Sequence, residues 1–193
     1  MELTALVRAS RGRVVWGPSL SAWRAPSAGP QLIAEPLRSQ TEWVMRYFED
    51  IEIGKRVEAG PYEVTQEEII EFAQRWDPRP YHTDAEAALR TTFKGLAASG
   101  AHTISIYYRL LYELSQVQQE PLAAIAALGF DVKLPSPVRP NDRLTLTTEP
   151  IEKRDSDTNP RAGIAVTRGI LVNQSGAVVL EIIATGLFAK RPV

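Results

Sequence analysis

The stretch DPRPYHTDAEAALRTTFKGLAASG, residues 77–100, carries a carboxylate at Asp77 and an imidazole five residues later at His82. It ends in Ser99-Gly100, where a long helical pattern begins. The chain has only two histidines, His82 and His102, so an imidazole at this spacing from a carboxylate is informative. Side chains of these types, held close together, are typical of an acid/base site.

Two prolines, Pro78 and Pro80, separate the two ionisable residues. Because the pyrrolidine ring fixes φ, they hold Asp77 and His82 at a set separation for a low entropic cost. Pro78 also disfavours the helical conformation in the residue before it, so Asp77 is expected where a helix ends. The pair is therefore predicted to be pre-organised.

Short helices are predicted on both sides of this pair. Thr65 and Glu68 have the spacing of a capping box, in which each side chain bonds the other residue's backbone N–H, and a helix should run over residues 65–76. Asp84 is expected to cap another short helix over residues 84–93, which favours a structural role for this carboxylate over a catalytic one.

The rest of the chain divides into one long helix and a set of strands. Apolar residues recur at helical spacing over residues 100–118, and a shorter apolar stretch follows at 122–128. Alternating segments then cover residues 129–134, 143–154, 163–176 and 177–191, and a polar hairpin loop is expected at 156–163. A helix-rich half followed by strands indicates an α+β domain, with an antiparallel sheet packed on the long helix.

Composition excludes several classes of protein. With 193 residues, 44% of them hydrophobic, and a net charge of −1, the chain suits one globular domain and offers no basic surface for nucleic acid. It has no cysteine, so neither a thiolate nucleophile nor a cysteine-ligated metal is available, and two histidines leave little for a metal site. No apolar run reaches membrane-spanning length, and the absence of cysteine fits a reducing compartment, so a cytoplasmic protein is expected.

Residues 1–44 differ from the remainder, with five arginines, no lysine and no sustained apolar periodicity. We predict a poorly ordered extension, and Met45, just before the first patterned segment, is the likelier initiator. A targeting leader is the alternative, although the proline-rich middle of this region argues against a long amphipathic helix. The folded domain is predicted over residues 45–193.

Several positions of the central stretch match a known signature. Asp77, Pro80, His82 and Asp84 resemble the D-x-N-P-x-H-x-D pattern of MaoC-like, (R)-specific enoyl-CoA hydratases, which have the hotdog fold. Further positions that match are Ala88, Phe93, Gly100 and the turn 137–142. The resemblance implies a single hotdog domain, in which an antiparallel β-sheet wraps around a long central α-helix.

The chain departs from the family's commonest pattern at three positions. Arg79 stands where the family typically has Asn, Ser99 where many members have His, and Asn141 where a Gly is usual. The change at residue 141 is mild, because Asn tolerates the left-handed conformation. Arg79 is expected to be an exposed loop cation, with a phosphate or a carboxylate across a dimer interface as the alternative partner.

The resemblance implies a hydratase or dehydratase acting on an acyl-CoA or related thioester in fatty acid metabolism. Asp77 and His82 would grip the water that adds to the double bond, and the Gly100 N–H would meet the thioester oxygen. Ser99 would orient the thioester or cap the helix, and capping is favoured. No metal or other cofactor is implied, and a homodimer is expected from sheets paired edge to edge.

Two other functions remain open from the sequence. One is a hotdog acyl-CoA thioesterase, which Glu113 supports poorly because it lies well past the helix start. The other is a non-catalytic subunit that binds an acyl thioester, which has no need of an acid/base pair.

His102 is expected to pack as a neutral residue, because a cation is unfavourable at a helix start. Three tyrosines of the long helix, Tyr107, Tyr108 and Tyr112, are expected in the core or at a dimer contact.

Overall fold

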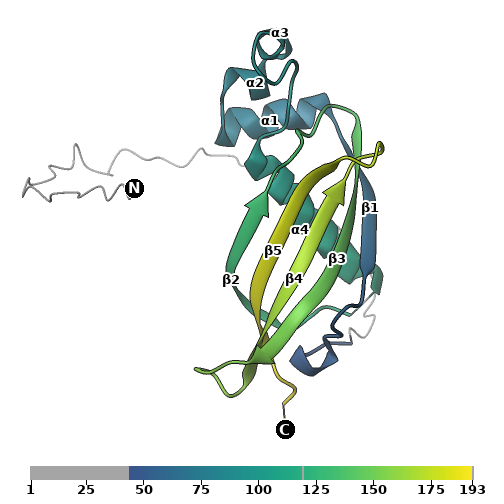
Figure 1. Ribbon diagram of the computed structural model, residues 1–193, viewed down its shortest axis with the longest axis vertical. Helices are drawn as coiled ribbons and strands as arrows, with labels where there is room; N and C mark the ends of the chain where they lie inside the picture. The colour runs from purple at the N-terminus through teal and green to yellow at the C-terminus, as the bar shows by residue number, and fades with distance from the viewer. Residues whose placement is uncertain (1–43, 119, 193) are drawn as a thin grey trace, which may run out of the picture. The chain divides into compact units, whose positions relative to one another are not determined.

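The computed structural model describes residues 44–118 and 120–192, drawn as a coloured ribbon in Figure 1. The extension predicted over residues 1–44 lies outside these residues, apart from Val44, and stays a prediction. Among the described residues, no helix is long and apolar enough to cross a membrane.

A short 3-10 turn, η2 (Phe48–Asp50), precedes the first strand, β1 (Val57–Val64). Four helices follow: α1 (Gln66–Trp76), α2 (Pro80–Thr83), α3 (Ala85–Leu89) and the long α4 (Gly100–Gln118). The chain then forms β2 (Ala124–Lys133), β3 (Asp142–Asp155), β4 (Ala162–Val172) and β5 (Val178–Ala189).

The five strands form one antiparallel sheet in the order β1-β3-β4-β5-β2. Figure 1 shows α4 running along one face of this sheet, while α1, α2 and α3 gather at the end where α4 begins. The core lies between the two layers, and its fully buried residues include Leu110 of α4 with Leu146, Leu171 and Ile182 of the strands. This is the hotdog arrangement, and the prediction of a single α+β domain of this kind is confirmed.

A glycine lets α4 approach the middle of the sheet closely. Tyr107 is 1% exposed, and its ring lies over Gly169 of β4. A Cβ at position 169 would fall 2.5 Å from that ring, so any side chain there would push the helix outward. Tyr107 is therefore a core residue, as the sequence predicted.

The helix termini follow the predicted capping only in part. Thr65 caps α1 by accepting the Glu68 N–H at 3.1 Å, and the Asp84 carboxylate caps α3 by accepting two backbone N–H groups. The Glu68 side chain does not return to the N-cap but bonds other side chains, so the reciprocal capping box is wrong. The helix predicted over 84–93 is also too long, because α3 ends at Leu89.

β2 is an edge strand with unusual exposure. It begins at Ala124, so the apolar stretch 122–128, predicted to precede the strand at 129–134, largely belongs to it. Ile125, Leu128 and Phe130 are each more than half exposed. The free edge therefore presents both unpaired backbone groups and apolar side chains.

Candidate active site

Asp77 lies at the point where α1 ends and the chain turns. Its backbone N–H donates to the Ala73 carbonyl at 2.8 Å, which closes the last turn of the helix, and Pro78 prevents a further one. The Arg79 N–H donates to the Asp77 carbonyl at 2.7 Å and fixes the turn. The Asp77 carboxylate is partly exposed, with 28% of its side-chain surface accessible.

His82 is held in one orientation by a backbone carbonyl. It lies in α2, which starts at Pro80, and only 5% of the residue is exposed. Its Nδ1 lies 2.6 Å from the Ala97 carbonyl oxygen. Because that oxygen can only accept, Nδ1 must carry the proton, and in the neutral ring Nε2 presents its lone pair. The ring of Tyr81 packs edge-on against the imidazole at 4.4 Å.

The two ionisable side chains face each other across a short gap. Nε2 of His82 lies 3.6 Å from Oδ2 of Asp77. This distance is too long for a direct hydrogen bond, and with a neutral imidazole both atoms are acceptors. A water molecule between them could donate one O–H to each. The pair therefore has the geometry to hold and activate a water.

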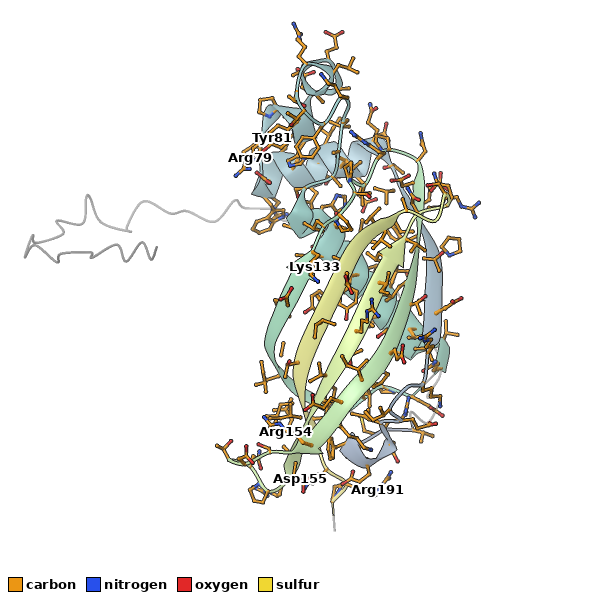
Figure 2. The ribbon with its side chains drawn as sticks, viewed as in Figure 1. Arg79, Tyr81, Lys133, Arg154, Asp155 and Arg191 are labelled. Atoms are coloured by element: carbon orange, nitrogen blue, oxygen red, sulfur yellow. The ribbon has the colours of Figure 1, made fainter. Side chains whose placement is uncertain are left out.

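Arg79 contacts the carboxylate within the same protomer. Its Nε lies 3.1 Å from Oδ1 of Asp77, and its Nη1 donates to the Tyr81 hydroxyl at 2.9 Å. Figure 2 shows Arg79 and Tyr81 side by side at the helical end of the domain. The side chain is 65% exposed, so the expected loop cation is indeed exposed, but the sequence did not reveal its ion pair with Asp77.

Ser99 and Gly100 form the start of α4, as predicted. The Ser99 hydroxyl accepts the His102 N–H at 3.2 Å and is 1% exposed, which is the capping role that the sequence favoured. A Cβ at residue 100 would lie 2.8 Å from Cδ1 of Leu134, so a larger residue here would have to displace the end of that exposed side chain. The first backbone N–H groups of α4 have no partner within the helix, which suits them to bind an oxyanion.

Arg139 supports the segment that leads into this helix, and sequence reasoning missed it. Its Nη1 donates to the carbonyls of Gly95 and Leu96 at 2.6 and 3.0 Å, and its Nη2 donates to Phe93. The next residue is Ala97, the acceptor of the imidazole. The only available signal was the place of Arg139 in the turn 137–142. In that turn Asn141 has φ 66°, which confirms the left-handed conformation expected there.

The second histidine, His102, belongs to a separate polar group. Its Nε2 lies 2.9 Å from Oε1 of Glu68, and the Tyr62 hydroxyl donates to the same oxygen at 2.6 Å. Burial raises the pKa of Glu68, but the hydrogen bonds from His102 and Tyr62 outweigh it, so the pKa is lowered. Burial, then the bond to Glu68, raises the pKa of Tyr62 to about 12. His102 is buried as predicted, but its carboxylate partner was not foreseen.

Two cavities flank α4. One of about 560 Å³ lies between the helix and the sheet and is lined mainly by apolar groups, among them Tyr108, Leu111, Phe130, Ala184 and Gly186. The other, of about 310 Å³, lies on the side of α1 and is lined by Glu68, Phe72, His102 and Arg109 with others. Within the described part of the chain, no three His, Asp or Glu side chains are grouped to hold a metal ion.

The sequence profile of the family described as MaoC like domain matches residues 49–171, which include the whole helical end of the domain. The chain belongs to this family. This MaoC-like domain is 35% identical to a MaoC-like dehydratase from Rhodospirillum rubrum, with a TM-score of 0.70, and the match covers 77% of this chain and 99% of that one. It is 31% identical to a monoamine oxidase regulatory protein from Archaeoglobus fulgius, with a TM-score of 0.69, over 76% and 96% of the two chains.

More distant proteins share the fold of this MaoC-like domain. The (R)-hydratase of A. caviae involved in PHA biosynthesis is 22% identical, with a TM-score of 0.55, over 74% of this chain and 99% of that one. A curated relative, the uncharacterized protein YdeM of Bacillus subtilis, is 27% identical over 107 residues, which are 55% of this chain and 74% of the relative.

Proposed function

We propose that this MaoC-like domain is a hydro-lyase that adds water to, or removes it from, the α,β-double bond of an acyl thioester such as an enoyl-CoA. The observation that carries the proposal is the Asp77–His82 pair, whose two facing acceptors lie 3.6 Å apart. Hydration of a conjugated thioester needs a group that takes a proton from water and a group that returns one to Cα. A water held by both side chains meets the first need and leaves its own lone pair free to attack Cβ.

The same pair closes the proton balance of the reaction. As the water oxygen bonds to Cβ, its proton passes to Asp77 or His82, and the pair delivers a proton to Cα. Both additions take place on the face of the double bond that the pair occupies, so the addition is syn, and the resemblance to the family implies the (R)-3-hydroxyacyl product. Dehydration is the reverse of these steps.

The start of α4 would stabilise the charge that forms on the thioester oxygen. The Gly100 N–H lies at the positive end of a 19-residue helix, where the first amides have no partner within the helix itself. Hydrogen bonds aimed at a developing oxyanion commonly contribute several kcal/mol, on the order of 3 for one donor. Ser99 contributes to this end by capping the helix.

The cavity of about 560 Å³ offers a place for the acyl chain, because its lining is largely apolar and includes the part of α4 from Tyr107 to Gln118, beyond Gly100. The exposed edge of β2 supports a homodimer in which two such strands pair. Pairing would satisfy the free backbone groups and cover Ile125, Leu128 and Phe130, which sedimentation velocity can examine.

The test is hydration of crotonyl-CoA and of longer enoyl-CoA esters by the purified chain. The reaction is monitored by the loss of absorbance of the conjugated thioester. Asp77→Asn and His82→Ala should each lower kcat by about 10³-fold or more, since each removes one acid/base group. Asp84→Asn is the matched control, because Asn keeps the cap on α3 and removes a carboxylate two residues from His82. Full activity in the first two variants would show that the residue roles are wrong.

The same assays separate the alternatives. Release of free CoA thiol from a saturated acyl-CoA would indicate a thioesterase, although Glu113 is paired with Arg109 at 2.7 Å and lies far from Gly100 along α4. Binding of acyl-CoA without turnover at every chain length would indicate a non-catalytic subunit.

A further inference from the structure

We infer that Tyr62, Glu68 and His102 form a positioning network, which holds the Asp77 carboxylate and the Gly100 N–H in register for the reaction. This inference rests on the function proposed above. None of the three residues touches Asp77 or His82 through a hydrogen bond in the structure. They act through the elements that carry those groups.

The network joins three separate elements at the helical end of the domain. Tyr62 comes from β1, Glu68 from the first turn of α1 and His102 from the first turn of α4. Figure 1 shows α1 lying across the start of α4. In the described part of the chain, the contact of 2.9 Å between Glu68 and His102 is the side-chain hydrogen bond that links these two helices.

His102 and Glu68 each make these contacts at a cost in free energy or in another hydrogen bond. His102 is 2% exposed and stacks on Phe72 at 4.6 Å, a place that an apolar side chain could fill. Its Nδ1 finds no hydrogen-bond partner among the described residues, which costs free energy in a buried site. Glu68 occupies the capping-box position of α1 but turns away from the helix terminus towards His102. A polar contact that is kept against such costs is suited to fix an orientation, because hydrogen bonds are directional.

The two linked helices end and begin at the groups that the reaction uses. Asp77 is the residue at which α1 stops, and Gly100 is two residues before His102. The conjugated enoyl thioester is planar and stiff, so the water at Cβ and the donor at the carbonyl oxygen must be correctly placed together. A displacement of about 1 Å between them can lower the rate on the order of 100-fold.

The alternative is that these residues only stabilise the fold. The two roles differ in their kinetic signature. Loss of stability alone lowers the folded fraction and leaves kcat per folded molecule unchanged, whereas loss of register lowers kcat itself. Because substrate binding uses contacts along the whole thioester, KM should change less than kcat.

The experiment compares His102→Leu, Glu68→Gln and their double variant with the wild-type chain, with activity expressed per folded molecule. We expect His102→Leu to lower kcat by about 10- to 100-fold and to change KM by no more than about threefold. His102→Gln, whose amide can still donate to Glu68, should recover most of the loss. In the double variant the loss should be no greater than in the more impaired single variant, because both changes break one contact.

Two variants guard the interpretation. Glu71→Gln removes an exposed carboxylate that lies one turn after Glu68 in α1 and lines the cavity of about 310 Å³ with Glu68 and His102. This variant should leave kcat unchanged. If His102→Leu does not fold, Tyr62→Phe removes a single hydroxyl from the network and should lower kcat by a smaller factor, about threefold to tenfold. Wild-type kcat in a folded His102→Leu or Tyr62→Phe enzyme, or additive losses in the double variant, would overturn the inference.

A measurement without turnover separates this inference from the proposed function. Crystal structures of the wild-type and variant proteins should show the Asp77 carboxylate displaced relative to the Gly100 nitrogen when the network is broken. An unchanged separation overturns the positioning role, even if the wild-type chain hydrates no thioester. Inactive wild-type protein with a displaced Asp77 would instead overturn the proposed reaction alone.

Discussion

Two pairs of a carboxylate and an imidazole lie at the same end of this domain. In the first, Asp77 and His82 are five residues apart in sequence, and 3.6 Å separates Oδ2 from Nε2. In the second, Glu68 and His102 are 34 residues apart, and 2.9 Å separates Oε1 from Nε2. The pair that is closer in sequence, Asp77–His82, is therefore the more widely separated in space. We call it the open pair and Glu68–His102 the closed pair.

The remaining partners of each pair explain this difference. Nδ1 of His82 donates a hydrogen bond to a backbone carbonyl and Nε2 remains free to accept one, so the first pair can bind a water or a substrate. Oε1 of Glu68 already accepts from Tyr62 and contacts His102, so that oxygen is saturated. Residue types alone do not distinguish the two pairs, whereas the facing atoms do: Nε2 of His82 and Oδ2 of Asp77 do not bond each other, and Nε2 of His102 and Oε1 of Glu68 do.

The largest expected effect on stability comes from removing Arg139, which supports the loop that orients His82. Arg139→Met deprives three carbonyls of residues 93–96 of a charged donor, which should lower the free energy of unfolding by about 3 kcal/mol. The kcat per folded molecule should fall about tenfold, because the loop positions the acceptor of His82. Denaturant titration and steady-state kinetics measure the two effects.

Arg143→Met is the matched control for this change, since Arg143 is exposed and, among the described residues, its side chain makes no hydrogen bond or ion pair with that loop. Equal unfolding free energies for the two variants would mean that Arg139 is dispensable. In that case the orientation of His82 would depend on α2 alone.

The dependence of stability on pH tests the second pair, Glu68 and His102. The pKa of Glu68 is lowered in the folded chain from its usual value near 4.5, so the unfolded chain binds more protons when the pH falls below that value. The stabilisation by Glu68 should be complete above about pH 4.5 and decline as the pH falls through the lowered pKa of the folded state. The difference in urea midpoint between wild type and Glu68→Gln should therefore shrink towards pH 3. A difference that grows with acidification would contradict the closed arrangement.

The smallest effect is expected at Arg79, the third partner of the open pair. Its ion pair with Asp77 is largely exposed, so Arg79→Gln should change the free energy of unfolding by less than about 1 kcal/mol. Its kcat should fall by about threefold to tenfold, because Oδ1 of Asp77 loses the contact that orients it. Arg79→Lys, which keeps the charge and loses the planar group, tests whether geometry or charge matters. A wild-type kcat in both variants would leave Asp77 oriented by its backbone alone.

The sequence was informative where the structure is local. Asp77 and His82 could be found because two prolines fix a short segment between them, and Asp84 because a helix cap depends on residues two and three positions away. Ser99 and Gly100 followed from the start of a long apolar pattern. The alternation of the last strands and their antiparallel pairing were equally visible.

What the sequence left out depends on packing between distant segments. Glu68 was expected to return to its own helix terminus, but the contact with His102 exists only once α1 lies across α4. Arg139 donates hydrogen bonds to carbonyls more than 40 residues earlier in the chain, and no local sequence pattern predicts such contacts. The start of β2 was set too late, because an exposed apolar run next to a long helix has no clear period of its own.

The placement of α4 also bears on how this enzyme family can diversify. One side of the helix carries His102, which bonds Glu68 of α1, while another, through Tyr108 and Leu111, faces the large cavity. Under the proposed function, substitutions on the cavity side would alter which acyl groups fit without disturbing the contact with α1. A helix divided in this way lets specificity drift over evolutionary time while the chemistry is inherited unchanged, and it marks the cavity side as the place to begin when the enzyme is redesigned.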